Sequence, residues 1–177
     1  GHEDGGYQAE IFEVKPDGDL RQVTHSGLPW CKWGLALSPD GNRLLFASYT
    51  LSGPEDPMLG CPGSTANFFT TDLDGRSLSQ ITFFTGSVFL DQISWSPQGG
   101  GIVFIRMYPS GGADEVWILD SSAAGPRRIA QGVAPVWSPD GTQIAFLWQD
   151  ICVASVSGTG YRCLGVRNKW IGPDSLW

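Results

Sequence analysis

Charge, helical periodicity and long apolar segments are all scarce in this chain of 177 residues. Only 16% of the residues are charged, and 11 lysines and arginines stand against 18 acids, a formal net charge of −7. Because nucleic acids and anionic membranes attract basic patches, this balance argues against both as partners. No apolar run approaches the roughly 18 residues of a membrane span. No stretch of about 12 residues has the helical period.

Residues that would indicate catalysis are also few. The chain has two histidines, His2 and His25, and no Gly-x-Ser-x-Gly sequence that would expose a serine nucleophile on a sharp turn. Residues 72–75, Asp-Leu-Asp-Gly, begin like a calcium loop but lack the later acids that complete the coordination shell. We therefore expect no catalytic residues, no metal and no cofactor.

Glycine and proline are plentiful, with 24 and 12 residues, which is typical of an all-β protein rich in turns. The clearest turn lies within residues 136–146, Val-Trp-Ser-Pro-Asp-Gly-Thr-Gln-Ile-Ala-Phe. Pro139 fixes φ, Asp140 can bond its own backbone two residues on, and Gly141 accepts positive φ. The segment is therefore predicted to be a hairpin.

This hairpin recurs along the chain. Related sequences occupy residues 37–46 and 95–104, and a fourth begins at 171, so that the repeat prolines are 58, 42 and 34 residues apart. A second hairpin with a glycine turn lies between successive copies. Two hairpins per repeat predict four-stranded antiparallel sheets, and the spacing brackets the roughly 40 to 50 residues of a propeller blade. A sandwich has no reason to repeat one sequence at this period.

The repeat resembles a known family. The Ser-Pro-Asp-Gly turn between Trp and Ile-Ala-Phe, with Asp-Leu-Asp-Gly at 72–75 and Gln-Ile-Thr at 80–82, is similar to the TolB-type β-propeller repeat over nearly the whole chain. Leu37, Gln98 and Ser175 depart from the pattern. The resemblance implies a ring of about six blades or more. It implies architecture rather than one activity, because such repeats build periplasmic translocation proteins, peptidase-associated propellers and other secreted proteins.

We predict one all-β domain over residues 1–177, a β-propeller or a section of one. It has an incomplete blade at 10–24, full blades at about 33–82, 93–130 and 134–165, and the first strand of a further blade at 166–171. The count of strands leaves the ring open at both ends. A larger propeller, a second copy or a second fragment would therefore complete it.

The four cysteines bear on the compartment. Cys152 and Cys163 lie on the two strands of one predicted hairpin, and we expect them to form a cross-strand disulfide on its outer face. Cys31 and Cys61 could then pair and fix an insertion between two strands. Four cysteines allow three connectivities, and four free thiols in a cytosolic protein are the alternative.

Two segments differ from the repeat, an insertion at 49–65 and an aromatic connector at 83–90. Long loops on a rigid scaffold often carry recognition, although an insertion can also be a plain surface loop. The connector aromatics either form exposed surface for a partner or pack between blades. The residues that we assign to a partner-binding surface are Tyr49, Glu55, Asp56, Met58, Leu59, Phe83, Phe84 and Phe89.

From these features we expect a non-enzymatic, extracytoplasmic scaffold that binds a protein or peptide. One alternative is the propeller part of a secreted peptidase or glycan-processing hydrolase whose catalytic residues lie elsewhere. Another is an architectural module of a surface assembly, which would self-associate.

Overall fold

The structure is a computed structural model that describes residues 10–25, 32–50, 55–56, 61–62, 65–108, 111–120, 125–157 and 160–165. Every regular element in these ranges is a β-strand. The described part of the chain has no helix that is long and apolar enough to cross a membrane.

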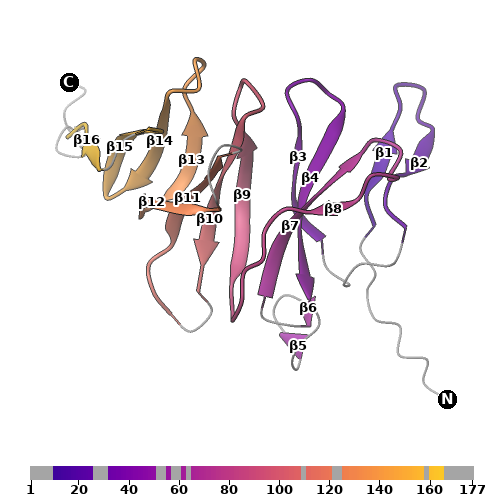
Figure 1. Cartoon of the computed structure of the whole chain (residues 1–177), viewed down its shortest axis with the longest axis horizontal. Helices are drawn as coiled ribbons and strands as arrows, with labels where there is room; N and C mark the ends of the chain where they lie inside the picture. The colour runs from indigo at the N-terminus through magenta and orange to yellow at the C-terminus, as the bar shows by residue number, and fades with distance from the viewer. Residues whose placement is uncertain are drawn as a thin grey trace, which may run out of the picture.

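Three four-stranded antiparallel sheets follow one another along the chain (Figure 1). Blade 1 consists of β3 (Lys32–Leu37), β4 (Arg43–Thr50), β7 (Thr65–Asp72) and β8 (Ser79–Gln80). Blade 2 consists of β9 (Phe89–Trp95), β10 (Gly101–Met107), β11 (Glu115–Asp120) and β12 (Arg127–Gln131). Blade 3 consists of β13 (Val133–Trp137), β14 (Gln143–Trp148), β15 (Asp150–Ser155) and β16 (Tyr161–Cys163).

Two short hairpins complete the described elements. The N-terminal hairpin, β1 (Phe12–Val14) and β2 (Leu20–Gln22), lies beside blade 1, and β5 (Glu55–Asp56) pairs with β6 (Cys61–Pro62) within the insertion (Figure 1). In each blade the strand order follows the sequence order, as in a propeller blade. The prediction of an all-β partial propeller is therefore confirmed. The further strand predicted at 166–171 lies outside the described residues.

The Ser-Pro-Asp-Gly turn forms through the side chains that its sequence suggests. Asp140 Oδ1 accepts hydrogen bonds from Ser138 Oγ at 2.5 Å and from the Thr142 amide at 3.1 Å, while Ser138 Oγ accepts from the Gln143 amide at 2.9 Å. The bond from Ser138, followed by those from Thr142, holds the pKa of Asp140 below its ordinary value. Asp140 is thus a turn-building residue.

The repeat tryptophans join consecutive blades. The indole Nε1 of Trp95 donates to the Ala36 carbonyl at 3.3 Å, and that of Trp137 donates to the Ser94 carbonyl at 3.1 Å. In both cases the acceptor lies on the first strand of the preceding blade. Apolar side chains buried between the blades stabilise the same junctions.

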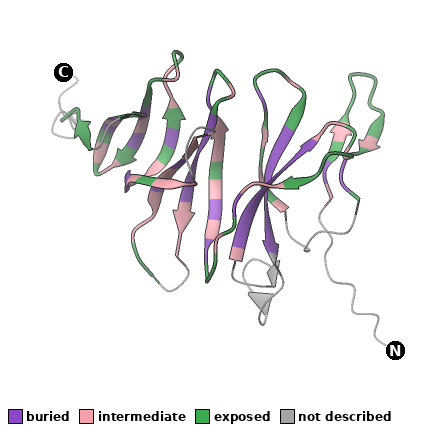
Figure 2. Cartoon of the chain, viewed as in Figure 1, coloured by how far each residue is buried: buried purple, intermediate pink, exposed green. Residues whose placement is uncertain are grey.

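The core consists of three clusters, one at each junction between sheets (Figure 2). Between blades 1 and 2, the rings of Phe68 and Phe104 meet edge to face with centres 4.8 Å apart. Between blades 2 and 3, Val103 and Ile118 face Ile144 and Phe146. All six side chains are buried. Apolar burial between sheets, at about 25 cal/mol per Å², is the main force that stacks the blades.

The disulfide between Cys152 and Cys163 is confirmed, but its predicted face is wrong. Cys152 pairs across the ladder with Phe146 and shares the buried face toward blade 2, whereas Ile151 is 41% exposed on the other face. Alternation misled the prediction because blade 3 is apolar on both faces. Cys31 and the side chain of Cys61 lie outside the described residues.

Two sheet faces keep exposed apolar side chains. One belongs to β3, where Leu35 and Leu37 are 55% and 54% exposed, beside a hairpin of only two strands. The other is the outer face of blade 3, with Val136 and Leu147 at 56% and 47%. In each of these blades one face is buried and the other face exposes apolar side chains. This arrangement is typical of a blade that packs against another blade on both faces.

Candidate interaction surface

One edge of the molecule gathers the segments that differ most between repeats. Because neighbouring strands are antiparallel, the turn between the second and third strands of a blade lies at the same end as the connector to the next blade. We call this end the connector rim. It carries the insertion with β5 and β6, the connector, the turn before β11 and the turn at Gln149 (Figure 1). The connector spans 81–88, so the last two residues of the segment predicted at 83–90 belong to β9. The two segments singled out from the sequence therefore lie on one rim.

The connector at 81–88 is held against β7 by hydrogen bonds. The amide of Ala66 donates to the Val88 carbonyl at 2.9 Å, and Thr65 Oγ1 donates to the Gly86 carbonyl at 2.6 Å. Asn67 Oδ1 accepts from the Phe84 amide at 2.7 Å. The segment is an ordered part of the rim, which keeps the aromatic side chains in fixed positions.

The aromatic side chains of the connector show both predicted arrangements, exposure on the surface and packing between blades. Phe83 is 75% exposed, so it forms part of the rim surface. Phe84 and Phe89 pack against the core between blades 1 and 2. Phe89 contacts Tyr49, whose ring centre lies 5.5 Å away.

The insertion residues are placed unevenly. Tyr49 is buried, and desolvation raises the pKa of its hydroxyl to about 12, so it supports the rim from beneath. Glu55 and Asp56 form β5, whose side chains are outside the described part of the structure. Met58 and Leu59 also lie outside the described residues.

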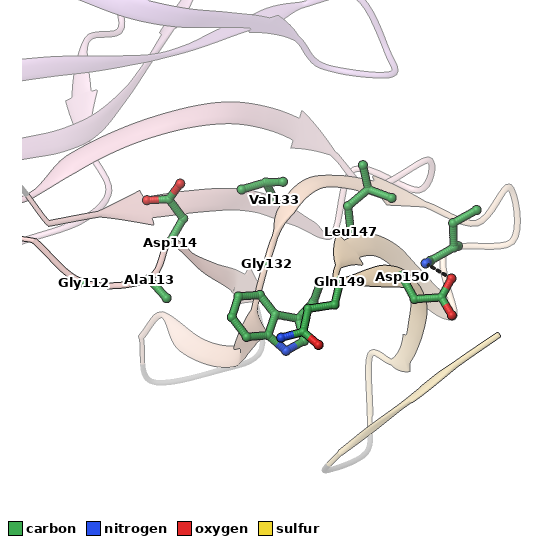
Figure 3. A pocket seen from close by; sticks show the side chains of 10 residues that line it. Gly112, Ala113, Asp114, Gly132, Val133, Leu147, Gln149 and Asp150 are labelled. Atoms are coloured by element: carbon green, nitrogen blue, oxygen red, sulfur yellow. Dashed lines mark hydrogen bonds between the residues drawn. The ribbon is translucent and has the colours of Figure 1, made fainter. Parts of the chain in front are cut away.

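A cleft of about 750 Å³ opens on the connector rim, where residues of blades 2 and 3 line it, and it extends to Leu147 and Ile151 on the outer face of blade 3 (Figure 3). Three structural features frame it: the turn before β11, the junction between β12 and β13, and the tight turn between β14 and β15. Its lining residues are Gly112, Ala113, Asp114, Gly132, Val133, Leu147, Trp148, Gln149, Asp150 and Ile151.

The walls of this cleft combine apolar and acidic groups. In Figure 3, Asp114 and Asp150 lie toward opposite ends, with Val133 and Gln149 between them. Asp150 Oδ1 accepts a hydrogen bond from the Ile151 amide at 2.7 Å. Such a surface can hold an apolar group and accept hydrogen bonds from amide or ammonium donors. The described residues contain no group of three or more side chains suited to hold a metal ion.

Close backbone approach explains how the cleft is shaped. Gly132 has φ of 150°, and a Cβ there would meet the Leu147 carbonyl oxygen at 2.8 Å and the Phe146 ring at 2.7 Å. Gln149 alone turns the chain between β14 and β15, with φ of 54°. This cleft was not predicted from the sequence. The available signal was an aspartate at or just before the third strand in two successive repeats, Asp114 and Asp150.

Comparison with known proteins supports the fold. No family model matches the sequence, and no curated protein matches it. Among solved structures, a protein of Agrobacterium tumefaciens described as a TolB matches with a TM-score of 0.55 and 20% identity, over 88% of this chain and 52% of that one.

Two peptidase structures also match. The tricorn protease matches with a TM-score of 0.63 and 12% identity, over 94% of this chain and 20% of that one. Dipeptidyl peptidase 4 of Porphyromonas gingivalis matches with a TM-score of 0.60 and 13% identity, over 87% of this chain and 29% of that one. The chain is therefore a partial β-propeller, and it spans about half the length or less of these similar structures.

Proposed function

We propose that this chain is a non-enzymatic, extracytoplasmic scaffold that binds a protein or peptide through its connector rim. The observation that carries the proposal is the cleft of about 750 Å³ between blades 2 and 3. Its size is within the roughly 300 to 1,000 Å³ of small-ligand sites, and its apolar walls with a few polar groups are typical of such sites.

The chemistry of the cleft favours a peptide segment. Trp148 and Leu147 offer apolar contact, while Asp114 offers acceptors for backbone amides or a cationic side chain. The net charge of −7 adds to the attraction for a donor-rich or cationic segment.

The disulfide supports the extracytoplasmic part of the proposal. Cys152 and Cys163 are joined across a hairpin, and such bonds persist mainly in oxidising compartments. Counting free thiols in protein purified from its natural source under alkylating conditions tests the compartment. A reduced pair would contradict it.

Peptide selection provides the direct test of rim binding. A displayed library of random peptides is selected on the immobilised, disulfide-intact chain, and the enriched peptides are titrated against Asp114→Asn and Leu147→Ala. We expect both variants to weaken binding by at least about tenfold, the equivalent of a charged hydrogen bond or a buried apolar side chain. Leu78→Ala is the control, because Leu78 is exposed at the opposite end of blade 1. Failure to enrich peptides, or binding that ignores the cleft variants, would contradict the proposal.

A second candidate is the propeller part of a hydrolase. Two similar structures are a tricorn protease and a dipeptidyl peptidase, and this chain covers 20% and 29% of them. Turnover assays with peptide and glycan panels, applied to the chain and to the longest form found in cells, separate the candidates. Activity of the 177-residue chain itself would overturn the non-enzymatic proposal.

The architectural alternative rests on the exposed apolar faces. If a second copy covers Leu35 on β3 and Ile151 on blade 3, the solution mass is that of a dimer or larger assembly. The variants Leu35→Lys and Ile151→Lys should then shift the mass to a monomer. A monomeric wild-type chain would exclude self-association as the means of closure.

A further inference from the structure

Three aromatic rings enclose one arginine at the connector rim between blades 1 and 2. The Cζ atom of Arg106 lies 5.0 Å from the ring centre of Phe84, 5.0 Å from that of Tyr108 and 4.9 Å from that of Trp117. All three distances are within the roughly 6 Å of cation–π attraction. We call these four residues the arginine cage.

The cage is assembled from segments distant in sequence. Arg106 is near the end of β10, Tyr108 follows that strand, Trp117 lies on β11, and Phe84 comes from the connector that Asn67 holds in place. Phe84 and Trp117 meet edge to face, with centres 6.3 Å apart. The rings therefore form a rigid wall around the guanidinium.

The carboxylate that faces Arg106 across the ladder is engaged elsewhere. Glu115 lies directly opposite Arg106 in the ladder between β10 and β11. Its Oε2 accepts hydrogen bonds from the Tyr108 hydroxyl at 2.8 Å and from Trp117 Nε1 at 3.0 Å, and its Oε1 accepts from Arg128 Nε at 2.5 Å. Three donors thus occupy both oxygens of Glu115.

These bonds also fix the charge of Glu115. Burial raises the pKa of this carboxyl, but the hydrogen bonds from Tyr108, Trp117 and Arg128 outweigh burial, so the pKa lies below its ordinary value. Glu115 is therefore ionised at neutral pH and paired with Arg128. Among the described residues, Arg106 forms no ion pair with this carboxylate.

The guanidinium of Arg106 has its two Nη groups available. Within the described ranges no carboxylate or carbonyl accepts a hydrogen bond from them, and they are not among the buried atoms, whereas Nε is buried without an acceptor. The side chain as a whole is half-buried, so part of it reaches the surface. Because buried donors in proteins are nearly always satisfied, an available guanidinium in a rigid aromatic wall is suited to an acceptor from another molecule.

We propose that the arginine cage is a receptor for a carboxylate of the peptide partner, which rests on the peptide-binding function proposed above. A carboxylate matches the planar fork of a guanidinium and accepts two parallel hydrogen bonds from it. The aromatic walls exclude water from the flanks, which strengthens the pair. Phe83, 75% exposed beside Phe84, provides an apolar contact for the residue that carries the carboxylate.

The surroundings favour a carboxylate over a phosphate. The cage provides one positive charge, while the ionised Glu115 and the net charge of −7 repel a dianion. A single negative charge on a planar group therefore fits the cage best.

The test compares one peptide in two forms. N-acetyl-trialanine with a free C-terminal carboxylate and its C-terminal amide are titrated into the ¹⁵N-labelled wild-type chain, and the Nε–H signal of Arg106 is followed. We expect the free acid to shift this signal saturably and to bind at least about tenfold more tightly than the amide. An amide with an internal aspartate shows whether a side-chain carboxylate serves as well as a terminal one. Saturable binding of either carboxylate, tighter than that of the trialanine amide, supports the proposal.

Substitutions test whether the preference for the free acid depends on Arg106. Arg106→Met keeps the apolar stem and should abolish the preference for the acid, and Arg106→Lys should lose most of it because the ammonium lacks the fork. Arg43→Gln is the matched control, because Arg43 also contacts a tryptophan, Trp95 at 5.8 Å, but lies at the opposite end of the blades. It should leave the preference unchanged.

Three outcomes would overturn the proposal. They are equal binding of acid and amide by the wild-type chain, no binding of either carboxylate form, and tighter binding of inorganic phosphate than of carboxylate. The first would leave peptide binding at the rim intact, since the selected peptides and the cleft variants at Asp114 and Leu147 test that function separately. The comparison on the wild-type chain holds even if Arg106→Met fails to fold.

Discussion

The amide of Ala134 donates a 2.7 Å hydrogen bond to the side-chain oxygen of Gln92, which lies one blade earlier. The two residues occupy the same position of the repeat, five residues before its proline. Both have left-handed backbone conformations, with φ of 52° and 50°, where the ladder to the next strand shifts register. Gly34 occupies the same position in blade 1 with φ of 52°. A bulge in the first strand of each blade is therefore part of the repeat.

Substitutions at this bulge should have opposite effects on stability. Gln92→Ala removes the bond to Ala134 and should lower the free energy of unfolding by about 0.5–1.5 kcal/mol. Ala134→Gly relieves a left-handed conformation that costs roughly 1–2 kcal/mol, offset by the larger entropy of glycine in the unfolded chain, so a gain of up to about 1 kcal/mol is expected. Urea unfolding measures both. Ala36→Gly, at a position without positive φ, should destabilise, and a loss at Ala134→Gly would refute the strain argument.

Two glycines in matching conformations test how the N-terminal hairpin attaches to blade 1. Gly75 and Gly41 have φ of 72° and 71°, so alanine is strained at both. At Gly75 a Cβ would also overlap the backbone carbonyl of Val23, whereas at Gly41 nothing lies within 4 Å. We expect Gly75→Ala to cost roughly 1–3 kcal/mol more than Gly41→Ala. Hydrogen exchange should show early opening of β1 and β2 in the first variant. Equal losses of stability in the two variants would mean that the N-terminal hairpin moves away from the added Cβ at no cost in free energy.

The fold could be predicted because the same sequence pattern recurs in successive blades. Each copy of the Ser-Pro-Asp-Gly turn sets a hairpin, and the period sets the blade. The pairing of Cys152 with Cys163 followed from their places on one hairpin, but the face did not, since Ile151 and Cys152 are both apolar neighbours on a sheet with two apolar faces.

The candidate sites were harder to predict because they lie between repeats. The cleft joins Asp114 of one blade to Asp150 of the next, and the arginine cage joins Phe84 to Trp117 across a blade junction. The register of β10 and β11 places Arg106 opposite Glu115, yet it does not reveal that three other donors bind that carboxylate. Competition among hydrogen-bond donors is decided by three-dimensional geometry, which a repeat pattern does not encode.

The disulfide should contribute measurably to stability. Cys152 and Cys163 are 11 residues apart, and closing a loop of this size restricts the unfolded chain by about 3 kcal/mol. Cys163→Ala breaks the bond at an exposed position and leaves the buried Cys152 in the core, so it should account for most of the loss. The double variant Cys152→Ala/Cys163→Ala should lose only slightly more. Urea unfolding at neutral pH measures these values, and a double variant as stable as the wild type would contradict the expectation.

Glu115 should make stability depend on pH in one direction. Its pKa in the folded chain is depressed, because hydrogen bonds from Tyr108, Trp117 and Arg128 outweigh the opposing effect of burial. A depressed pKa stabilises the fold above the ordinary carboxyl value of about 4.3, and this contribution is lost as pH falls through the folded-state pKa. Glu115→Gln should therefore be less stable than the wild type at pH 7, on the order of 1 kcal/mol. The difference should shrink as the pH is lowered from 5 to 3.

The control is Glu13→Gln, which removes a carboxylate from a half-exposed ion pair with Arg21. Exposed pairs contribute roughly 0–1 kcal/mol, so this variant should differ little from the wild type across the same range. Urea midpoints at several pH values give both curves. If the deficit of Glu115→Gln stays constant down to pH 3, the ionised carboxylate is not what ties Tyr108, Trp117 and Arg128 together. Glu115 would then stabilise the fold through packing and not through its charge. Competition from the other three donors would not be the reason that Arg106 lacks an ion pair with Glu115.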